Sequence, residues 1–308
     1  MQVKRDKRDV HGVLLLDKPL GMSSNKALQR VKYLLRARKA GHTGSLDPLA
    51  TGMLPLCFGD ATRYSHVFLD ADKTYDVTAT LGGRSATGDA EGDIVQTAPV
   101  PFLSLEDWQA IGDQFLGESK QVPPMYSALK HDGKRLYDIA RKGGDVERPP
   151  RRIVIEYLTI TAVGDDSINF SVRCSKGTYI RSLVEDLATT AGTLAWTSML
   201  RRTAVSPFSS AMVTMEALEA AGDTLPELLA GCDAGLTNWA QVMLTAPEAL
   251  AFCQGRLASL PSGQPGPRRC YGPNGLFLGT ALTHADGSFA DVRVMSAARM
   301  TLETARVR

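Results

Sequence analysis

The strongest constraint on the fold is a series of strand-like segments alternating with amphipathic helical ones. Residues 73–81 alternate between apolar and polar side chains, a pattern typical of a half-buried strand. Short apolar runs predict further strands at 12–17, 153–160, 168–174 and 197–206. The strands at 153–160 and 168–174 are expected to be antiparallel neighbours. Helical spacing of apolar residues predicts helices near 24–35, 105–116 and 179–191, with Ser23 or Ser24 and Thr178 as candidate caps.

The remaining segments suggest the domain organisation. A length of 308 residues favours about two domains. Glycines and prolines predict a loop at 41–60, and the polar, acidic composition of 83–100 predicts another. Residues 119–152, which are basic and contain Pro and Gly pairs, are interpreted as a flap inserted into the main domain. We therefore expect a catalytic domain over 1–245. A small β-barrel module, with one helix and short strands, is expected over 246–308.

Charge is unevenly distributed along the chain. The formal net charge is only +2, but residues 1–40 hold 11 basic against 3 acidic residues. The flap (residues 119–152) holds 9 basic against 4 acidic residues, whereas residues 203–308 hold 7 against 9. Two basic segments favour a polyanionic partner, because phosphates are bound with release of counterions. Composition alone does not separate RNA from DNA or from an anionic membrane.

Cysteine usage and the N-terminus exclude several classes of protein. The five cysteines are odd in number and form no CxxC pair, which argues against a disulfide scaffold or a thiolate zinc site. The charged N-terminus has an apolar run of only Val13 to Leu16, too short for a signal peptide or membrane span. These features predict a cytoplasmic, metal-free globular protein with no membrane association.

The most unusual segment is the loop-like stretch 41–52, which surrounds Asp47. Asp47 precedes Pro48, which pushes its backbone away from the helical region, and the flanking glycines allow tight turns. A carboxylate on such a loop is held in place. An Asp-Pro pair by itself is most often only a turn, and a lone histidine such as His42 is more often structural than functional.

Two further segments carry candidate site residues. Arg181 falls in the first turn of a predicted helix, where the dipole disfavours a cation, so a carboxylate or phosphate partner is expected. The alternative is an ordinary exposed arginine. Tyr75 begins an alternating strand, where core packing is the common role and stacking on a nucleobase the functional one.

These segments together resemble one family, the bacterial TruB type of pseudouridine synthase, which modifies uridine 55 in the T-loop of tRNA. The resemblance covers about 200 residues in matching order and is weaker beyond about residue 215. It rests on GVLLLDKPLGMSSN (12–25), KAGHTGSLDPLATGMLPLCFGDAT (39–62), DKTYDVTATLG (72–82), VPPMYSALKHDGKRLYDIAR (122–141), CSKGTYIRSL (174–183) and MLRRTAVSPF (199–208).

The resemblance implies an α+β fold. Its catalytic domain would have a largely antiparallel mixed sheet, and its C-terminal RNA-binding module would be of the PUA kind. The implied partner is the tRNA T-stem-loop, bound by a monomer that needs no protein partner and no cofactor. The net negative charge of the last third makes that module a poor general phosphate binder.

The resemblance also implies residue roles. Asp47 would be the nucleophile, Arg181 its ion-pair partner, and Tyr179 a contact to the base that assists proton removal. The implied substrate-binding residues are Tyr75, which stacks on uracil, Leu200 in the base pocket, His42 on the flipped-out RNA, Lys18 and Pro19 behind the loop, and Lys130 in the flap.

The chemistry suits this set of residues. Moving ribose C1′ from uracil N1 to C5 needs no redox change or metal, and one carboxylate suffices for a covalent adduct. A nearby arginine lowers the pKa of that carboxyl, and an aromatic platform compensates the stacking lost by a flipped base. Attack at C1′ and attack at uracil C6 both remain open.

Two other functions compete with this one. A tRNA-folding chaperone would need no nucleophile, although an enzyme that opens tRNA can also assist folding. An aspartyl hydrolase is disfavoured, since no second carboxylate or metal-ligand cluster stands near Asp47 in the sequence.

Overall fold

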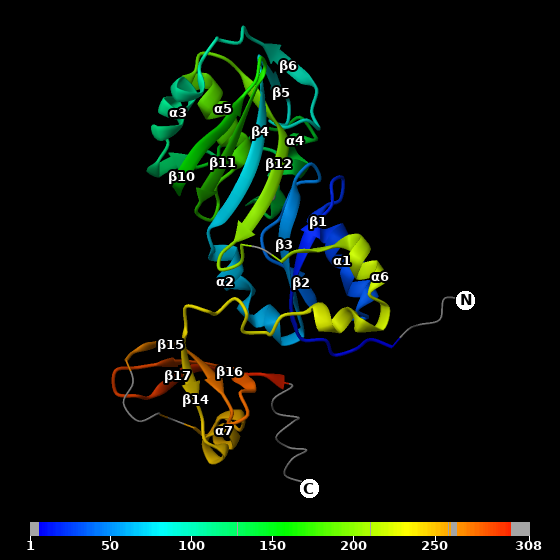
Figure 1. Ribbon diagram of the computed structural model, residues 1–308, viewed down its shortest axis with the longest axis vertical. Coiled ribbons are helices and arrows are strands. Elements are labelled where there is room, and N and C mark those ends of the chain that lie inside the picture. The colour runs from blue at the N-terminus through cyan, green and yellow to red at the C-terminus, as the bar shows by residue number, and fades with distance from the viewer. Residues whose placement is uncertain (1–5, 128, 210, 258, 260–263, 297–308) are drawn as a thin grey trace, which may run out of the picture.

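The protein is described by a computed structural model in which residues 6–127, 129–209, 211–257, 259 and 264–296 are placed. One large sheet runs through the upper part of the molecule, and a small sheet lies below it (Figure 1). The large sheet has nine strands in the order β13-β1-β3-β12-β4-β11-β10-β7, with β2 added beside β3. The pairs β1–β13 and β3–β12 are parallel and the others are antiparallel. The expected largely antiparallel α+β architecture is therefore confirmed.

The elements of the N-terminal part alternate between strands and short helices. They are β1 (Gly12–Lys18), α1 (Ser24–Leu34), β2 (Ala40–His42), β3 (Thr51–Phe58), η1 (Gly59–Tyr64), α2 (Ser65–Asp70), β4 (Lys73–Leu81), β5 (Gly83–Ser85), β6 (Ile94–Thr97), α3 (Leu105–Asp113) and β7 (Gly117–Gln121).

The flap and the rest of the chain supply the remaining elements. They are β8 (Lys130–His131), β9 (Lys134–Arg135), α4 (Leu136–Ala140), β10 (Arg151–Val163), β11 (Ser167–Cys174), α5 (Ile180–Thr190), β12 (Ala195–Val205), β13 (Val213–Thr214), α6 (Met215–Ala220), η2 (Gly222–Leu228), β14 (Ala240–Met243), α7 (Ala246–Cys253), β15 (Gly266–Tyr271), β16 (Phe277–Thr283) and β17 (Phe289–Val294).

The main core lies between the large sheet and helices α1, α3 and α5. Its members include Val31 of α1, Trp108 of α3, Leu187 of α5 and Val77 of β4, all nearly inaccessible to water. Each helix contributes an apolar stripe at helical spacing, while the strands contribute alternate residues. Burial of these faces fixes the sheet, and the sheet in turn fixes the loops at its ends.

Three expectations about local structure are wrong. Residues 41–60 contain a central strand, because the apolar run in β3 is buried and pairs with β1, β2 and β12. Residues 83–100 hold the β5–β6 hairpin rather than a plain loop. Thr178 does not cap α5. Its hydroxyl donates to the Ser175 carbonyl instead. Tyr179 occupies the cap position, and its side chain makes no capping hydrogen bond.

The flap leaves and re-enters the sheet at one point. Gln121, the last residue of β7, pairs with Arg151, the first residue of β10, so residues 122–150 form an insertion between adjacent strands. The insertion carries the β8–β9 hairpin and α4.

The C-terminal part packs against the underside of the main unit. Its four strands follow the order β14-β15-β16-β17, and its first strand begins at Ala240, before residue 246. A second apolar cluster joins it to the main unit through residues such as Met53, Tyr64, Phe252 and Leu278. Asp60 strengthens the junction by accepting hydrogen bonds from the backbone and hydroxyl of Ser296.

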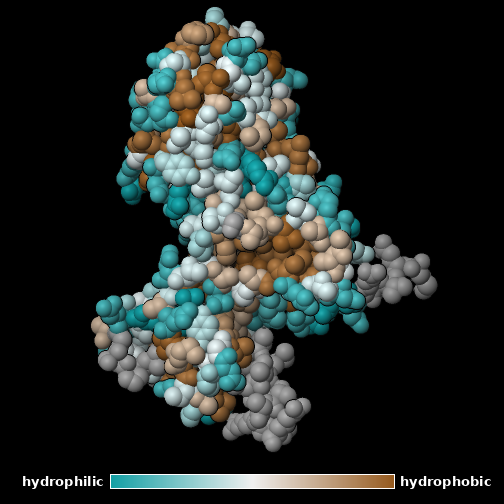
Figure 2. Space-filling model, viewed as in Figure 1, coloured by the Kyte–Doolittle hydropathy of each residue, from teal (hydrophilic) through white to brown (hydrophobic). Residues whose placement is uncertain are grey.

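The surface is mixed in character. Figure 2 shows apolar residues near the top of the molecule, where the β5–β6 hairpin and α3 lie, and exposed members there include Ile94, Val95, Phe102 and Leu105. Among the described residues, no helix has both the length and the apolar character needed to span a bilayer.

Gly52, at the start of β3, provides a test of the fold. Its φ is +95°, and a Cβ atom there would lie 2.2 Å from the Arg202 carbonyl oxygen. We expect Gly52→Ala to lower the free energy of unfolding by about 1–3 kcal/mol or more, from backbone strain and steric clash. Gly192→Ala is the control, since Gly192 has a φ of +78° but open space around it. If denaturant unfolding showed equal losses of unfolding free energy in the two variants, the close approach of β3 to β12 would be contradicted.

Candidate functional site

Asp47 lies on a loop between β2 and β3 that is held from both sides. The Ser24 hydroxyl accepts from the Leu46 N–H at 2.7 Å and lies 3.0 Å from the Leu46 carbonyl oxygen. The Gly21 N–H donates to the Pro48 carbonyl at 2.8 Å, and Lys18 Nζ lies 3.5 Å from the same oxygen. The residues on each side of Asp47 are thereby fixed to the turn between β1 and α1.

A buried arginine fixes the rest of this loop. Arg202, on β12, is 1% exposed and donates from Nε to the Met53 carbonyl at 2.6 Å and from Nη2 to the Gly44 carbonyl at 3.0 Å. The guanidinium therefore ties both ends of the Asp47 loop to the central strand. Gly44 has a φ of +84°, a conformation that glycine adopts without strain.

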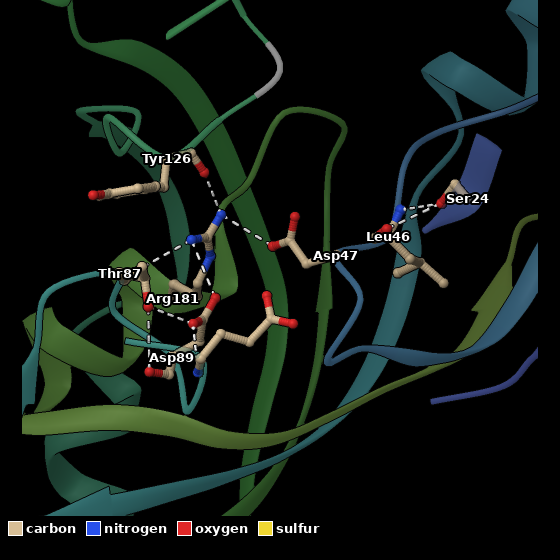
Figure 3. Close-up of polar contacts among 8 residues, drawn as sticks. Ser24, Leu46, Asp47, Thr87, Asp89, Tyr126 and Arg181 are labelled. Atoms are coloured by element: carbon tan, nitrogen blue, oxygen red, sulfur yellow. Dashed lines mark hydrogen bonds and ion pairs between the residues drawn. The ribbon is translucent and has the colours of Figure 1, made fainter. Parts of the chain in front are cut away.

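Arg181 lies in the first turn of α5 and meets Asp47 directly. Nη2 is 3.0 Å from Asp47 Oδ2, and Nη1 is 3.3 Å from Asp89 Oδ2. The same guanidinium donates to the carbonyls of Thr87 at 2.8 Å and Tyr126 at 2.6 Å. Figure 3 shows the guanidinium surrounded by these four partners. The predicted ion pair of Arg181 is thus present, shared between two carboxylates.

Asp89 is the second carboxylate of the site, and the expectation that none stands near Asp47 is wrong. The two residues are far apart in sequence, but the loop of Asp89 docks on β12, where the Thr197 carbonyl accepts from the Ala90 N–H and the Thr197 N–H donates to the Gly88 carbonyl. Asp89 Oδ1 accepts from the Thr87 hydroxyl at 2.5 Å and the Glu91 N–H at 3.1 Å, while Oδ2 faces Arg181. With both oxygens engaged, Asp89 is not placed to activate a water molecule as a hydrolase would require.

A cavity of about 400 Å³ opens above the Asp47–Arg181 pair. Tyr75 on β4, Tyr179 before α5 and Leu200 on β12 line it together with that pair. The lining therefore combines the Asp47 carboxylate with the guanidiniums of Arg181 and Arg202, the Lys73 ammonium, two aromatic rings and several apolar side chains.

The electrostatic environment of Asp47 combines opposing effects. Removal from water raises the pKa of Asp47 above its usual value, and Arg181 opposes that rise. The expected effect of the arginine is present, but burial outweighs it. Burial also raises the pKa of Tyr179, so the neutral phenol is the resting form. That direction favours contact with a base over service as a general base.

Two lysines of this region are also buried: Lys73 is part of the cavity lining, and Lys18 lies outside it. Burial lowers the pKa of Lys18 to about 8, against a smaller opposing effect of Asp47. Lys18 Nζ donates to the carbonyls of Pro19 at 2.9 Å and Met22 at 2.6 Å. Lys73 has a pKa lowered to about 8 by burial, and its ammonium donates to the last carbonyls of α2 at Phe68 and Leu69.

The predicted site residues separate into three groups. Five of them line the cavity: Asp47, Tyr75, Tyr179, Arg181 and Leu200. Lys18, Pro19 and His42 lie behind or beside the Asp47 loop rather than in the described lining, and His42 Nδ1 is buried without a hydrogen-bond partner. Lys130 lies in β8, and its side chain falls outside the described part of the chain.

Sequence reasoning missed Asp89, Arg202 and Lys73 as parts of the site. Asp89 lies in a polar acidic stretch that carries no pattern of its own. Arg202 belongs to the alternating strand 197–206, where an inward-facing charge needs a buried partner, and that is the signal that could have identified it. Lys73 adjoins Tyr75 but carried no assigned role. Within the described ranges, no group of His, Cys, Asp and Glu is arranged to hold a metal ion.

Comparison with solved structures supports the fold. The chain is similar to the structure of a Cbf5-Nop10-Gar1 complex, with a TM-score of 0.69, 22% identity and coverage of 92% of this chain and 85% of that one. An archaeal box H/ACA sRNP Nop10-Cbf5 complex matches with a TM-score of 0.66 and 22% identity, covering 93% and 86% of the two chains. At this identity the likeness shows the fold alone.

Sequence comparisons define the class and then the family. Family models described as "TruB family pseudouridylate synthase (N terminal domain)" and "tRNA pseudouridylate synthase B C-terminal domain" match residues 32–180 and 181–237. The class is therefore the pseudouridylate synthases, enzymes that isomerise uridine to pseudouridine.

Curated relatives named tRNA pseudouridine synthase B occur in Pseudomonas fluorescens strain Pf-5, at 46% identity over 96% of this chain and 98% of the relative. Another, from Cupriavidus metallidurans, is 51% identical over 89% of this chain and 91% of the relative. The chain belongs to the TruB family.

The opposing effects on Asp47 predict a shift in pH dependence. Removing the positive charge of Arg181 removes the influence that lowers the pKa of Asp47, so that pKa rises further. We expect the acid limb of the single-turnover rate in Arg181→Met to move to higher pH than in wild type. Arg201→Met, which removes the partner of Asp17 outside the cavity, should leave the limb in place. An acid limb that stays in place or moves to lower pH in Arg181→Met would show that the rate does not depend on an Asp47 ionisation controlled by Arg181.

Proposed function

We propose that this chain converts the uridine at position 55 in the T-loop of tRNA to pseudouridine, with Asp47 as the nucleophile. The observation that carries the proposal is the Asp47–Arg181 pair at the floor of a cavity lined by Tyr75, Tyr179 and Leu200. Membership of the TruB family and the names of the curated tRNA-modifying relatives support the substrate. We also propose that the chain acts as a monomer without a protein partner, because its own basic flap can supply the RNA-binding surface that a stand-alone enzyme needs.

The roles of the lining residues follow from their chemistry. Arg181 orients the Asp47 carboxylate and opposes its protonation. Tyr75 offers its ring to the flipped uracil, and stacking on an aromatic ring is worth about 1–3 kcal/mol per base. Tyr179, as a neutral phenol, contacts the base edge, while Leu200 contributes apolar contact. Lys18, Pro19 and His42 support the loop and the RNA around it.

The reaction balances within the substrate and the protein. The bond between C1′ and N1 breaks, a bond between C1′ and C5 forms, N1 gains a proton, and C5 loses one. The Asp47 carboxylate forms a transient covalent bond to C1′ or to uracil C6 and is regenerated. No oxidant, metal or group donor enters the balance.

Outside the cavity, we propose that the flap and the C-terminal part hold the RNA. The flap presents exposed basic side chains at Lys134, Arg141 and Lys142, and its residues Ser127 and Leu129 form part of the cavity lining. A PUA-like role for residues 246–308 fits a small sheet packed beneath the main unit, and its basic side chains Arg268 and Arg269 are partly buried.

The nucleophile assignment is tested by loss of chemistry with binding retained. We expect Asp47→Asn to abolish tritium release from tRNA labelled at uracil C5, because an amide forms no such adduct, while tRNA affinity stays within about twofold. Asp113→Asn, at an exposed position at the end of α3, is the matched control and should release tritium normally. Mapping of the product tests position 55. Release by the Asp47→Asn variant would remove Asp47 from its role, and absence of release by wild type with tight binding would favour the chaperone.

The flap proposal predicts a change in salt dependence. Neutralising Lys134, Arg141 and Lys142 together to glutamine should weaken tRNA binding and flatten the plot of log affinity against log salt. Each lost phosphate contact removes about 0.7–0.9 from its slope. The opposite change, Asp132, Asp138 and Asp145 to asparagine, should strengthen binding. An unchanged slope in the basic triple variant would place the flap outside the RNA interface.

A further inference from the structure

Gln121 stands where the flap joins the sheet. It is the last residue of β7, it pairs with Arg151 of β10, and it is 6% exposed. A buried amide at such a junction must satisfy its own donor and acceptor. The partners that it finds belong to the active-site segment rather than to the flap.

The Gln121 amide bonds both backbone groups of Tyr179. Its Oε1 accepts from the Tyr179 N–H at 2.7 Å, and its Nε2 donates to the Tyr179 carbonyl at 3.1 Å. Tyr179 is the cap residue of α5, and its own side chain makes no capping bond. Gln121, at the end of β7, therefore supplies the hydrogen bonds that fix the start of α5, where no local side chain does so.

Through Tyr179, these hydrogen bonds also affect the position of Arg181 in the cavity. The Tyr179 carbonyl also accepts from the Leu183 N–H at 3.1 Å, which closes the first turn of α5 around Arg181. Arg181 in turn donates to the carbonyl of Tyr126 in the flap at 2.6 Å. Gln121 and Tyr126 thus hold Tyr179 and Arg181, the two cavity-lining residues at the start of α5.

We propose that Gln121 is a positioning residue for pseudouridine formation, which sets the backbone of Tyr179 and, through the first turn of α5, the direction of Arg181. Gln121 does not line the Asp47 cavity, and both ends of its amide are engaged by Tyr179, so it acts through Tyr179 rather than on the substrate. The inference rests on the proposed function of Tyr179 and Arg181.

The protein contains a matched control for this proposal. Gln109 on α3 makes the same kind of two-point contact, donating to the Leu158 carbonyl at 3.0 Å and accepting from the Ile160 N–H at 2.8 Å. Both of these backbone partners lie on β10, the further bond of Gln109 goes to Asp113 of its own helix, and none of the three partners lines the cavity. Loss of either amide removes two hydrogen bonds to backbone, but only Gln121 holds an active-site residue.

The test compares Gln121→Met with Gln109→Met in thermal unfolding, tRNA affinity and single-turnover formation of pseudouridine. Both variants should lower the melting temperature. Gln121→Met should slow the chemical step about tenfold or more, because small displacements of catalytic groups have large effects on rate. Its tRNA affinity should stay within about twofold, and Gln109→Met should keep the wild-type rate.

A second variant distinguishes loss of positioning from loss of the fold. In Gln121→Glu, the carboxylate still accepts from the Tyr179 N–H, and only the protonated acid donates to the Tyr179 carbonyl. Its rate relative to wild type should therefore rise as the pH falls.

A wild-type rate in Gln121→Met, or equal slowing in both methionine variants, would overturn the positioning role. A flat rate ratio across pH in Gln121→Glu would also overturn it. If the wild-type protein itself forms no pseudouridine, the proposed function fails, and the inference fails with it.

Discussion

The site depends on one buried guanidinium. Arg181 is 7% exposed, and its acceptors come from the Asp47 loop, the Thr87–Asp89 loop and the flap, while its own backbone belongs to α5. A charge removed from water is tolerated only when it is paired and fully hydrogen-bonded. The guanidinium therefore brings together four segments that are distant in sequence, and the carboxylate that faces the cavity is oriented as one of its partners.

A second guanidinium, that of Arg202, fixes the loop that carries the carboxylate partner of Arg181. Arg202 holds the Gly44 and Met53 carbonyls, so the loop that carries Asp47 is tied to β12, next to Leu200 in the cavity wall. Together with Ser24 and Lys18, it leaves the loop little freedom to move. The proposed covalent catalysis by Asp47 requires orientation of this kind, since the attacking oxygen would have to approach one carbon of the nucleotide.

Much of this arrangement can be predicted from local sequence, and there is a physical reason why the rest cannot. The alternation at 73–81 correctly predicted β4, and the Asp47 and Arg181 segments pointed to residues that the structure places 3.0 Å apart. The β3 strand resembles a loop in sequence because Gly52, Pro55 and the following Gly59 mask a buried apolar run. Asp89 and Gln121 have no local signal, because their partners lie on distant segments and only the tertiary fold pairs them.

The most direct test of the account is a crystal structure of the Asp47→Asn variant bound to a T-loop RNA that carries uridine 55. The account predicts that the uracil of uridine 55 is flipped into the cavity against Tyr75. The side chain at position 47 should lie about 3–3.5 Å from C1′ or C6, the range of a near-attack geometry. A base that stays stacked within the RNA, or an RNA bound on another face with the cavity empty, would contradict it.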